Sequence, residues 1–147
     1  MVQMQQSVEI ARPLEEVFAF VANPGNDARW GSNLAEVTQL SPGPLGVGAR
    51  FRYKARFAGR EFELVREVTE YEPNRRQAVK TISGPLRFGG VRTFEAIPGG
   101  TRITLTGGGR VGGFFGLAEP LLLRAAQRSL RADLATLKRL LEGQPIA

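Results

Sequence analysis

Two arginines on predicted strands are the side chains best placed to do chemistry in this chain. Arg66 has the strand parity of the apolar Leu64, and Arg92 likewise has that of Phe94. Successive side chains of a strand point to opposite faces, so both arginines face the apolar side unless a bulge reverses the parity. A guanidinium there needs a partner, and in a ligand cavity that partner would be a ligand carboxylate or phenolate. Tyr53, on a neighbouring predicted strand, would supply a hydrogen bond to the same ligand.

The residue types that are missing exclude several chemistries. The chain has no cysteine and no histidine, which excludes thiol nucleophiles, zinc sites of the Cys/His kind and Ser-His-Asp triads. The glutamates of the predicted strands mostly alternate opposite the apolar residues, so they form no inward pair for general acid–base catalysis. We therefore predict no catalytic residue, no metal site and no cofactor.

Aromatic side chains of inward parity either line a pocket or fill a core, because both arrangements give the same alternation. Trp30 is the only tryptophan. It either packs in the core, where it seals the short helices onto the sheet, or places its ring at the mouth of a pocket. Ala125, Ala126 and Ser129 add little volume on the predicted C-terminal helix, which favours a pocket at that end. The candidate cavity residues are Trp30, Phe51, Tyr53, Phe57, Phe62, Leu64, Arg66, Thr81, Phe88, Arg92, Phe94, Leu122 and Ala126.

A glycine-rich segment, residues 107–113, precedes the predicted long helix. It lacks the Lys-Ser/Thr ending of a phosphate-binding loop and does not follow a parallel strand, so it matches that motif poorly. Its glycines predict a hinge between sheet and helix. With the phenylalanines that follow, the hinge is a candidate gate for ligand entry, made of Gly112, Gly113, Phe114 and Phe115.

Alternating hydrophobicity predicts a mainly antiparallel β protein. The expected strands cover residues 3–10, 34–41, 49–57, 60–71, 77–83, 87–96 and 101–109. A short helix with Pro13 at its first position follows the first strand and stops at residues 23–26, before a second short turn or helix over 27–30. Between 114 and 142 the leucines recur at helical spacing, which predicts a long amphipathic helix.

The predicted fold class is α+β: a curved seven-stranded antiparallel sheet around a long C-terminal helix, with two short helices after the first strand. The length of 147 residues suits a single domain, 1–147. The net charge of +6 comes from dispersed arginines without a nucleic-acid-binding motif, so we expect no nucleic-acid partner. No apolar run approaches the ~18 residues of a membrane span and no leader segment is visible, so we expect a cytoplasmic protein without stable membrane insertion.

Several segments carry a family resemblance in their order and spacing: residues 10–18, 23–30, 44–48, 68–76, 99–104 and 137–142. They include Asn23-Pro24 followed by Arg29-Trp30, and the closing Leu137-Lys138-Arg139-Leu140. Together they resemble the START-like or helix-grip (SRPBCC) superfamily, in particular its polyketide cyclase/dehydrase and lipid-transport type. The resemblance implies a cavity between helix and sheet that receives apolar, often ring-containing, ligands. It does not select a chemistry.

Three functions are compatible with these features. The first is binding or transport of a small hydrophobic ligand, lipid-like or aromatic and polyketide-like. The second is an enzyme of the cyclase or dehydratase kind, in which Tyr53 and Arg66 supply a hydrogen bond and a charge. The third is an interaction module whose basic helix face, Arg124, Arg128 and Arg131, meets an acidic partner or a membrane surface. The sequence leaves open the ligand, any catalysis and whether two chains form a homodimer.

Overall fold

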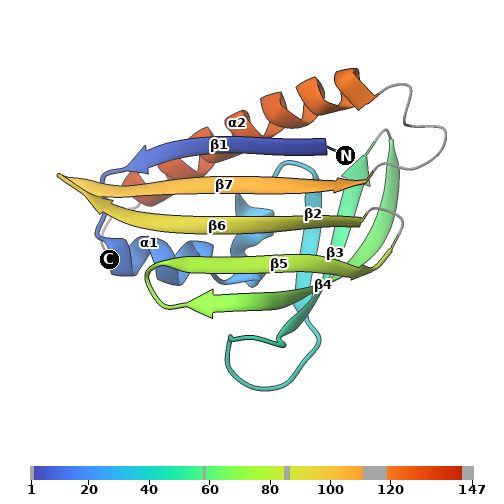
Figure 1. Ribbon diagram of the computed structural model, residues 1–147, viewed down its shortest axis with the longest axis horizontal. Coiled ribbons are helices and arrows are strands. Elements are labelled where there is room, and N and C mark those ends of the chain that lie inside the picture. Colours follow the sequence, from blue (N-terminus) through green and yellow to red (C-terminus); the bar gives the residue numbers. More distant parts are fainter. Residues whose placement is uncertain (1, 58, 85–86, 111–118, 144–147) are drawn as a thin grey trace.

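The chain folds into one seven-stranded antiparallel sheet with helices on one side, in a computed structural model that describes residues 2–57, 59–84, 87–110 and 119–143. The strands are β1 (Val2–Ile10), β2 (Leu34–Gln39), β3 (Arg50–Phe57), β4 (Arg60–Glu72), β5 (Arg76–Ser83), β6 (Arg87–Ile97) and β7 (Gly100–Arg110). The helices are α1 (Leu14–Val21), the 3-10 helix η1 (Pro24–Arg29) and α2 (Glu119–Gly143). The sheet order β1-β7-β6-β5-β4-β3-β2 leaves β1 and β2 at the edges (Figure 1). The predicted order of elements is confirmed.

The second short helix begins earlier than predicted. Residues 23–26 are predicted to be a stop, whereas η1 already begins at Pro24. The Asn23 side chain caps η1 by accepting a hydrogen bond from the Gly25 amide at 3.0 Å, and proline is favourable at the first position of a helix. The same short segment therefore ends α1 and starts η1. Pro13 is predicted to be the first residue of the first short helix, whereas α1 begins one residue after it.

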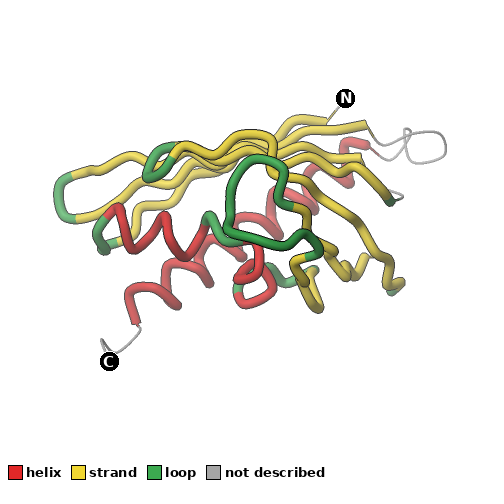
Figure 2. Tube along the Cα trace, turned by 90° about the horizontal axis from the view of Figure 1, so that it is seen from below, coloured by secondary structure: helices red, strands yellow, loops and turns green. Residues whose placement is uncertain are grey.

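The sheet curls toward the helices. Figure 2 shows the helices on one face of the sheet, which bends toward them at the end where Figure 1 places β3 and β4. The β4–β5 ladder has two register shifts, between Val65 and Arg66 and between Val68 and Glu70. A bulge increases the local twist and bends a strand, so these shifts help the sheet to wrap. The result is a concave face that holds the core.

Two hydrophobic clusters fill this concave face. The first joins α1 and the C-terminal half of α2 to β1, β6 and β7, and contains Ile10, Val17, Phe18, Val21, Ala22, Trp30, Phe94, Ile103, Leu105, Leu134, Leu137 and Leu141. The second lies on β3, β4 and β5 and contains Ala49, Phe51, Tyr53, Leu64, Val68 and Val79. Tyr71 packs against both clusters. The interior is therefore divided, and polar side chains occupy the region where the two clusters meet.

The C-terminal half of α2 is fixed against the sheet. Leu134, Leu137 and Leu141 are buried in the first cluster, and full burial of such a side chain contributes about 1.5–3 kcal/mol. The described helix begins at Glu119, whereas the prediction begins at residue 114; residues 111–118 lie outside the described part of the chain. The leucines in the C-terminal half of the predicted stripe therefore anchor the helix to the sheet.

Hydrogen bonds also tie α2 to the end of β1. Lys138 donates from Nζ to the Glu9 carbonyl oxygen at 2.6 Å. The Ala11 amide donates to Oε2 of Glu142 at 2.8 Å. Figure 1 shows α2 crossing behind the sheet and emerging beside β1. The first strand and the last helix therefore hold one another in place.

Gly100 begins β7 where β1 ends, and the two chains approach closely there. A Cβ on Gly100 would collide with the carbonyl oxygen of Ile10 and lie 3.1 Å from the Ala11 Cα. Both are backbone atoms, which cannot rotate away. We expect Gly100→Ala to lower the free energy of unfolding by about 2 kcal/mol or more, because the β1–β7 ladder must shift. Urea denaturation followed by circular dichroism measures this loss.

Gly46 provides the matched control. A Cβ on Gly46 meets no described atom within 4 Å, and its backbone φ is not in the left-handed region. Gly46→Ala should therefore change stability by no more than about 0.5–1 kcal/mol, in the stabilising direction. Equal effects of the two substitutions would show that the close approach at Gly100 is not a constraint.

Candidate functional site

A group of polar side chains bridges the two hydrophobic clusters on the concave face. They come from η1 and four neighbouring strands: Asp27 of η1, Tyr53 of β3, Arg66 of β4, Gln77 and Thr81 of β5, and Arg92 of β6. The ladder register sets Arg66 opposite Thr81. It sets Gln77 opposite Arg92. Side chains directly opposite in a ladder share a face, so the register gathers these groups on the inner side.

Asp27 is the centre of this group and is only 2% exposed. Arg92 donates from Nη1 to Oδ1 at 3.1 Å and from Nη2 to Oδ2 at 2.8 Å. The Tyr53 hydroxyl donates to Oδ2 at 3.0 Å. Arg92 also donates to the Val21 carbonyl oxygen at the end of α1, and its guanidinium carbon lies 5.5 Å from the Trp30 ring centroid. This bidentate ion pair fixes α1 and η1 to the middle of the sheet.

The environment fixes the protonation states of both partners of Asp27. Burial raises the pKa of the Tyr53 hydroxyl well above its ordinary value, and the negative charge of Asp27 adds to that effect. Burial acts to lower the pKa of Arg92, but the charge of Asp27 and the hydrogen bonds to it outweigh burial, so that pKa is raised. At neutral pH Tyr53 is therefore a neutral donor rather than a base, and Arg92 is a permanent cation.

Arg66 is a second cation in the same region, and none of the described carboxylates forms an ion pair with it. Its guanidinium carbon lies 5.1 Å from the Tyr53 ring centroid. Its Nε atom is enclosed and has no hydrogen-bond partner among the described residues, although the side chain as a whole keeps partial exposure. Burial lowers the pKa of Arg66, and the like charge of Arg92 acts in the same direction. The guanidinium of Arg66 therefore carries its positive charge in a buried environment that disfavours the charged form.

Three further enclosed polar atoms have no partner among the described residues: Nε1 of Trp30, Oε1 of Gln77 and Oγ1 of Thr81. Gln77 is oriented through its other amide atom, Nε2, which donates to the Ala22 carbonyl oxygen. Buried polar groups in folded proteins nearly always have a hydrogen-bond partner. Each unpartnered atom therefore indicates a place for a water molecule or a ligand atom.

Two glycines face each other on the inner side of the sheet, next to this group. Gly90 and Gly107 are opposite one another in the β6–β7 ladder, and each has the parity of a buried neighbour, Phe94 and Ile103. A Cβ on either glycine would lie within 4 Å of only one described atom, a backbone oxygen at 3.8 Å for Gly90 and 3.6 Å for Gly107. No described side-chain atom lies within 4 Å of either Cβ position.

The structure places the predicted cavity residues in three sets. Those buried in the interior are Trp30, Phe51, Tyr53, Leu64, Thr81 and Phe94. Those with partial exposure are Phe62, Arg66, Arg92 and Ala126. The third set lies outside the described part of the chain, either as whole residues or as side chains. It contains Phe57, Phe88, Leu122 and the gate residues Gly112, Gly113, Phe114 and Phe115. A ligand contact for any of them stays a prediction.

The sequence-based prediction assumes that the small residues of α2 all face the sheet. In the structure they do not all do so. Ala125 is exposed, and Ala126 is partly buried. The Ser129 hydroxyl accepts a hydrogen bond from Nδ2 of Asn33 at 3.2 Å, which ties the helix to the loop before β2. At about 100° per residue these three side chains span an arc of about 100° on the helix, with Ala125 at the exposed edge of that arc.

Sequence reasoning missed Asp27 and Gln77. Asp27 falls in a segment with no strand or helix periodicity, so its burial has no pattern in the sequence. One signal was available: if parity turns Arg92 inward, a carboxylate must lie near it, because a buried guanidinium requires compensation. Gln77 begins a predicted strand, and its inward direction follows only from the register with Arg92.

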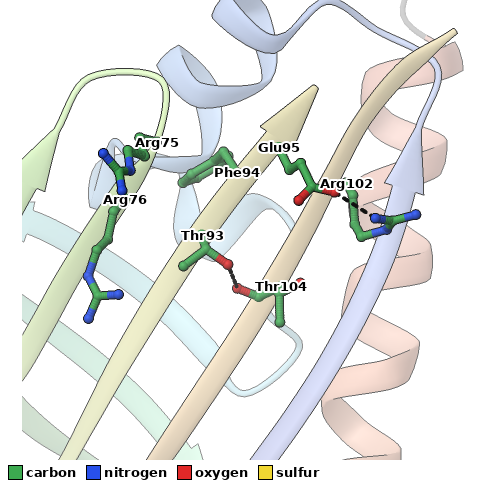
Figure 3. A pocket seen from close by; sticks show the side chains of 7 residues that line it. All are labelled: Arg75, Arg76, Thr93, Phe94, Glu95, Arg102 and Thr104. Carbon is green, nitrogen blue, oxygen red and sulfur yellow. Dashed lines mark hydrogen bonds and ion pairs between the residues drawn. The ribbon is translucent and has the colours of Figure 1, made fainter. Parts of the chain in front are cut away.

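A surface pocket lies on the opposite, outward face of the sheet, which the sequence does not predict (Figure 3). It has a volume of about 300 Å³ and is lined by Arg75, Arg76, Thr93, Phe94, Glu95, Arg102 and Thr104. Two of its three arginines form ion pairs, and Arg76 pairs with Glu70 at 2.8 Å. Arg102 pairs with Glu9 at 3.0 Å and with Glu95 at 2.6 Å. We therefore place the candidate functional site on the concave face, where charge and hydrogen-bonding capacity are uncompensated.

Other possible sites are limited in the described residues. Within 2–57, 59–84, 87–110 and 119–143, no group of three or more acidic, histidine or cysteine side chains is arranged to hold a metal ion. None of the described helices is long and apolar enough to cross a membrane. Arg124, Arg128 and Arg131 are exposed on α2, so the basic surface of the interaction hypothesis is present.

The fold and sequence resemble known proteins. The profile of a family described as "Polyketide cyclase / dehydrase and lipid transport" matches residues 1–142. An uncharacterized protein of Mycobacterium tuberculosis (strain CDC 1551 / Oshkosh), MT0096, is 32% identical over 106 residues, which are 71% of this chain and 46% of that protein. The chain thus spans less than half the length of that relative.

Two solved structures share the fold. The protein TTHA0849 from Thermus thermophilus superposes with a TM-score of 0.81 at 20% identity, covering 97% of this chain and 99% of that one. The Zhui aromatase/cyclase from Streptomyces sp. R1128 has a TM-score of 0.75 at 19% identity, covering 92% of this chain and 90% of that one. At such identities the similarity establishes the architecture, which includes the curled sheet around the C-terminal helix.

Proposed function

Because the chain belongs to the polyketide cyclase/dehydrase and lipid-transport family, we propose that it binds a small hydrophobic ligand between the concave face of its sheet and α2. The observation that carries the proposal is the set of enclosed polar atoms without partners, on Trp30, Arg66, Gln77 and Thr81. Buried polar groups nearly always have a hydrogen-bond partner, so these atoms favour a site that a ligand completes. A ligand that is apolar over most of its surface, with a few polar atoms, satisfies them.

The division of the core supports the same function. Two apolar clusters flank the polar group, and the Gly90–Gly107 pair leaves the adjacent sheet surface without side chains. A ligand lying over the glycines would contact apolar residues on both sides, which is the usual composition of a ligand site. Its polar end would reach the arginine and threonine side chains of β4 and β5.

Native mass spectrometry of freshly purified protein tests whether an apolar molecule is carried. We expect one apolar molecule per chain, and saturable binding of the neutral dye Nile red at one site after that molecule is removed. Binding in a closed apolar site should also make the heat-capacity change negative in calorimetry. A protein that carries nothing and shows no saturable dye binding would contradict the proposal.

Adjacent glycines on β6 provide a matched pair of variants for the location of the ligand. Gly90→Ile places a side chain on the inner face, whereas Gly89→Ile places the same side chain on the outer face; isoleucine is favourable in strands. The nearest described atom to either Cβ is a backbone oxygen, at 3.8 Å and 3.7 Å, so neither substitution is blocked by the backbone. We expect Gly90→Ile to weaken Nile red binding at least about 10-fold, a loss of about 1.4 kcal/mol, and Gly89→Ile to leave it unchanged. Equal effects would place the ligand elsewhere.

A cyclase or dehydratase activity is the second candidate, favoured by Arg66, which lies over the Tyr53 ring and whose Nε has no hydrogen-bond partner among the described residues. The raised pKa of Tyr53 makes it a hydrogen-bond donor and not the base. Arg66 would then stabilise negative charge that develops on a substrate oxygen. The two functions differ in what is recovered: a carrier returns its ligand unchanged, whereas a dehydratase returns it lighter by the mass of one water.

A further inference from the structure

Among the described residues, the region between the two hydrophobic clusters holds one more positive charge than negative charges. Arg66 and Arg92 both enter the region between the two hydrophobic clusters, and Asp27 is the described carboxylate that faces them. Two cations and one anion leave a net charge of one positive unit. An uncompensated charge in a largely apolar interior is costly, so such a charge indicates a partner that is absent from the isolated chain.

Asp27 cannot serve both arginines. Its two carboxylate oxygens already accept two hydrogen bonds from Arg92 and one from the Tyr53 hydroxyl. No described ion pair joins Arg66 to this or any other carboxylate. The charge that lacks a partner is therefore that of Arg66, whereas Arg92 is committed to the structure.

The side chain opposite Arg66 has an unused hydroxyl. Thr81 is its direct partner in the β4–β5 ladder. Oγ1 of Thr81 and Nε of Arg66 are both enclosed, and neither has a hydrogen-bond partner in the described part of the chain. Phe51, the partner of Arg66 on the β3 side, is buried. The result is a guanidinium and a hydroxyl side by side, with apolar surface next to them.

We propose that Arg66 and Thr81 form a subsite for the carboxylate of an apolar acid. This inference rests on the proposed function, and it adds the charge and the chemical class of the ligand. The guanidinium donates to the carboxylate oxygens through its fork of N–H groups, the threonine hydroxyl donates to one of them, and the apolar remainder lies along the concave face toward Gly90. Hydrogen bonds to charged groups are worth about 1.5–3 kcal/mol, or about 10–100-fold in affinity.

Displacement of Nile red by matched pairs of compounds tests the subsite. The pairs are dodecanoate against dodecanol, and 2-naphthoate against 2-acetylnaphthalene, so that each anion is compared with a neutral molecule of similar shape. We expect the acid of at least one pair to bind about 10–100-fold more tightly than its neutral partner. The preference should disappear as the pH falls through the ligand carboxyl's own pKa, about 4–5.

Variants separate the subsite from a general effect of positive charge. Arg66→Met should remove the preference, by lowering the affinity of each acid to that of its neutral partner. Thr81→Val, which keeps the shape of the side chain, should reduce it by a smaller factor, about 3–10-fold. Arg75→Met, which removes an exposed arginine of the outward pocket, is the control and should change nothing.

Thermal stability gives a readout that does not depend on knowing the natural ligand. Removing an uncompensated charge should raise the midpoint of unfolding of the Arg66→Met protein above that of the unmodified protein, by about 2–4 °C. Dodecanoate should raise the midpoint of the unmodified protein and not that of the variant. This readout also shows that the variant is folded.

The outcomes distinguish the two proposals. Nile red binding with equal displacement by acids and neutral compounds overturns the carboxylate subsite and leaves the proposed function standing. Retention of acid preference by Arg66→Met overturns the subsite as well. An absence of saturable binding by the dye, the acids and the neutral compounds overturns both.

Discussion

Replacing Asp27 with asparagine is expected to lower the free energy of unfolding by about 3–5 kcal/mol. The change removes the carboxylate that accepts from Arg92 and Tyr53. Two guanidinium groups would then share an interior without a described anion to face them. Total stabilities of domains are about 5–15 kcal/mol, so the variant should unfold at a much lower urea concentration. Equilibrium urea denaturation followed by circular dichroism measures the difference.

An exposed ion pair provides the control for this prediction. Arg56 and Glu61 lie 3.5 Å apart with side chains 69% and 52% exposed, and such pairs contribute about 0–1 kcal/mol. Glu61→Gln should therefore leave the denaturation midpoint nearly unchanged. A double variant, Asp27→Leu with Arg92→Met, should recover much of the loss, since it replaces both charges by apolar groups. A loss below about 1 kcal/mol for Asp27→Asn would contradict the assignment of Asp27 as the counter-ion.

Leu137→Ala is expected to destabilise the protein by about 2–5 kcal/mol. Leu137 has no exposed surface and belongs to the first hydrophobic cluster, where α2 meets β1, β7 and α1. Truncation removes buried methyl groups and leaves a cavity that the surrounding strands cannot close fully. Calorimetric unfolding should show a lower midpoint and a lower unfolding enthalpy.

Leu40→Ala is the matched control, because it makes the same chemical change at a position that is 47% exposed. Its effect should lie within about 0.5 kcal/mol. If the two substitutions have similar effects, α2 is not held by its leucines, and the proposed site between sheet and helix loses one wall.

The architecture was accessible from the sequence because it depends on periodicities that neighbouring residues carry. Phe51 and Tyr53 alternate with Arg50 and Arg52, and this alternation requires a strand with one buried face wherever it lies. Differences are confined to element ends, such as the start of η1 at Pro24. There a capping asparagine and a proline act over three residues, which is too short for a periodic pattern.

The site was accessible only in part, because it depends on which strands become neighbours. Parity turns Arg66 and Arg92 toward the apolar side, and the structure has both in the interior. Strand parity alone does not show that the Asp27 carboxylate pairs with Arg92 and not with Arg66. The selection of Arg66 as the unpaired cation needs the position of η1 beneath the sheet, which is a tertiary property.

The contacts between β1 and α2 make the folding of this domain dependent on its whole length. Val2 pairs with Gly109 in the sheet, and the bond between Ala11 and Glu142 joins residues 131 positions apart. Such distant contacts require long loops to close before they stabilise anything, so folding should be slow compared with that of a helical bundle. On the ribosome the first hydrophobic cluster can only be completed after the last leucines have been synthesised. Until then the concave face, with its apolar residues and charged arginine, is open to chaperones and to other chains.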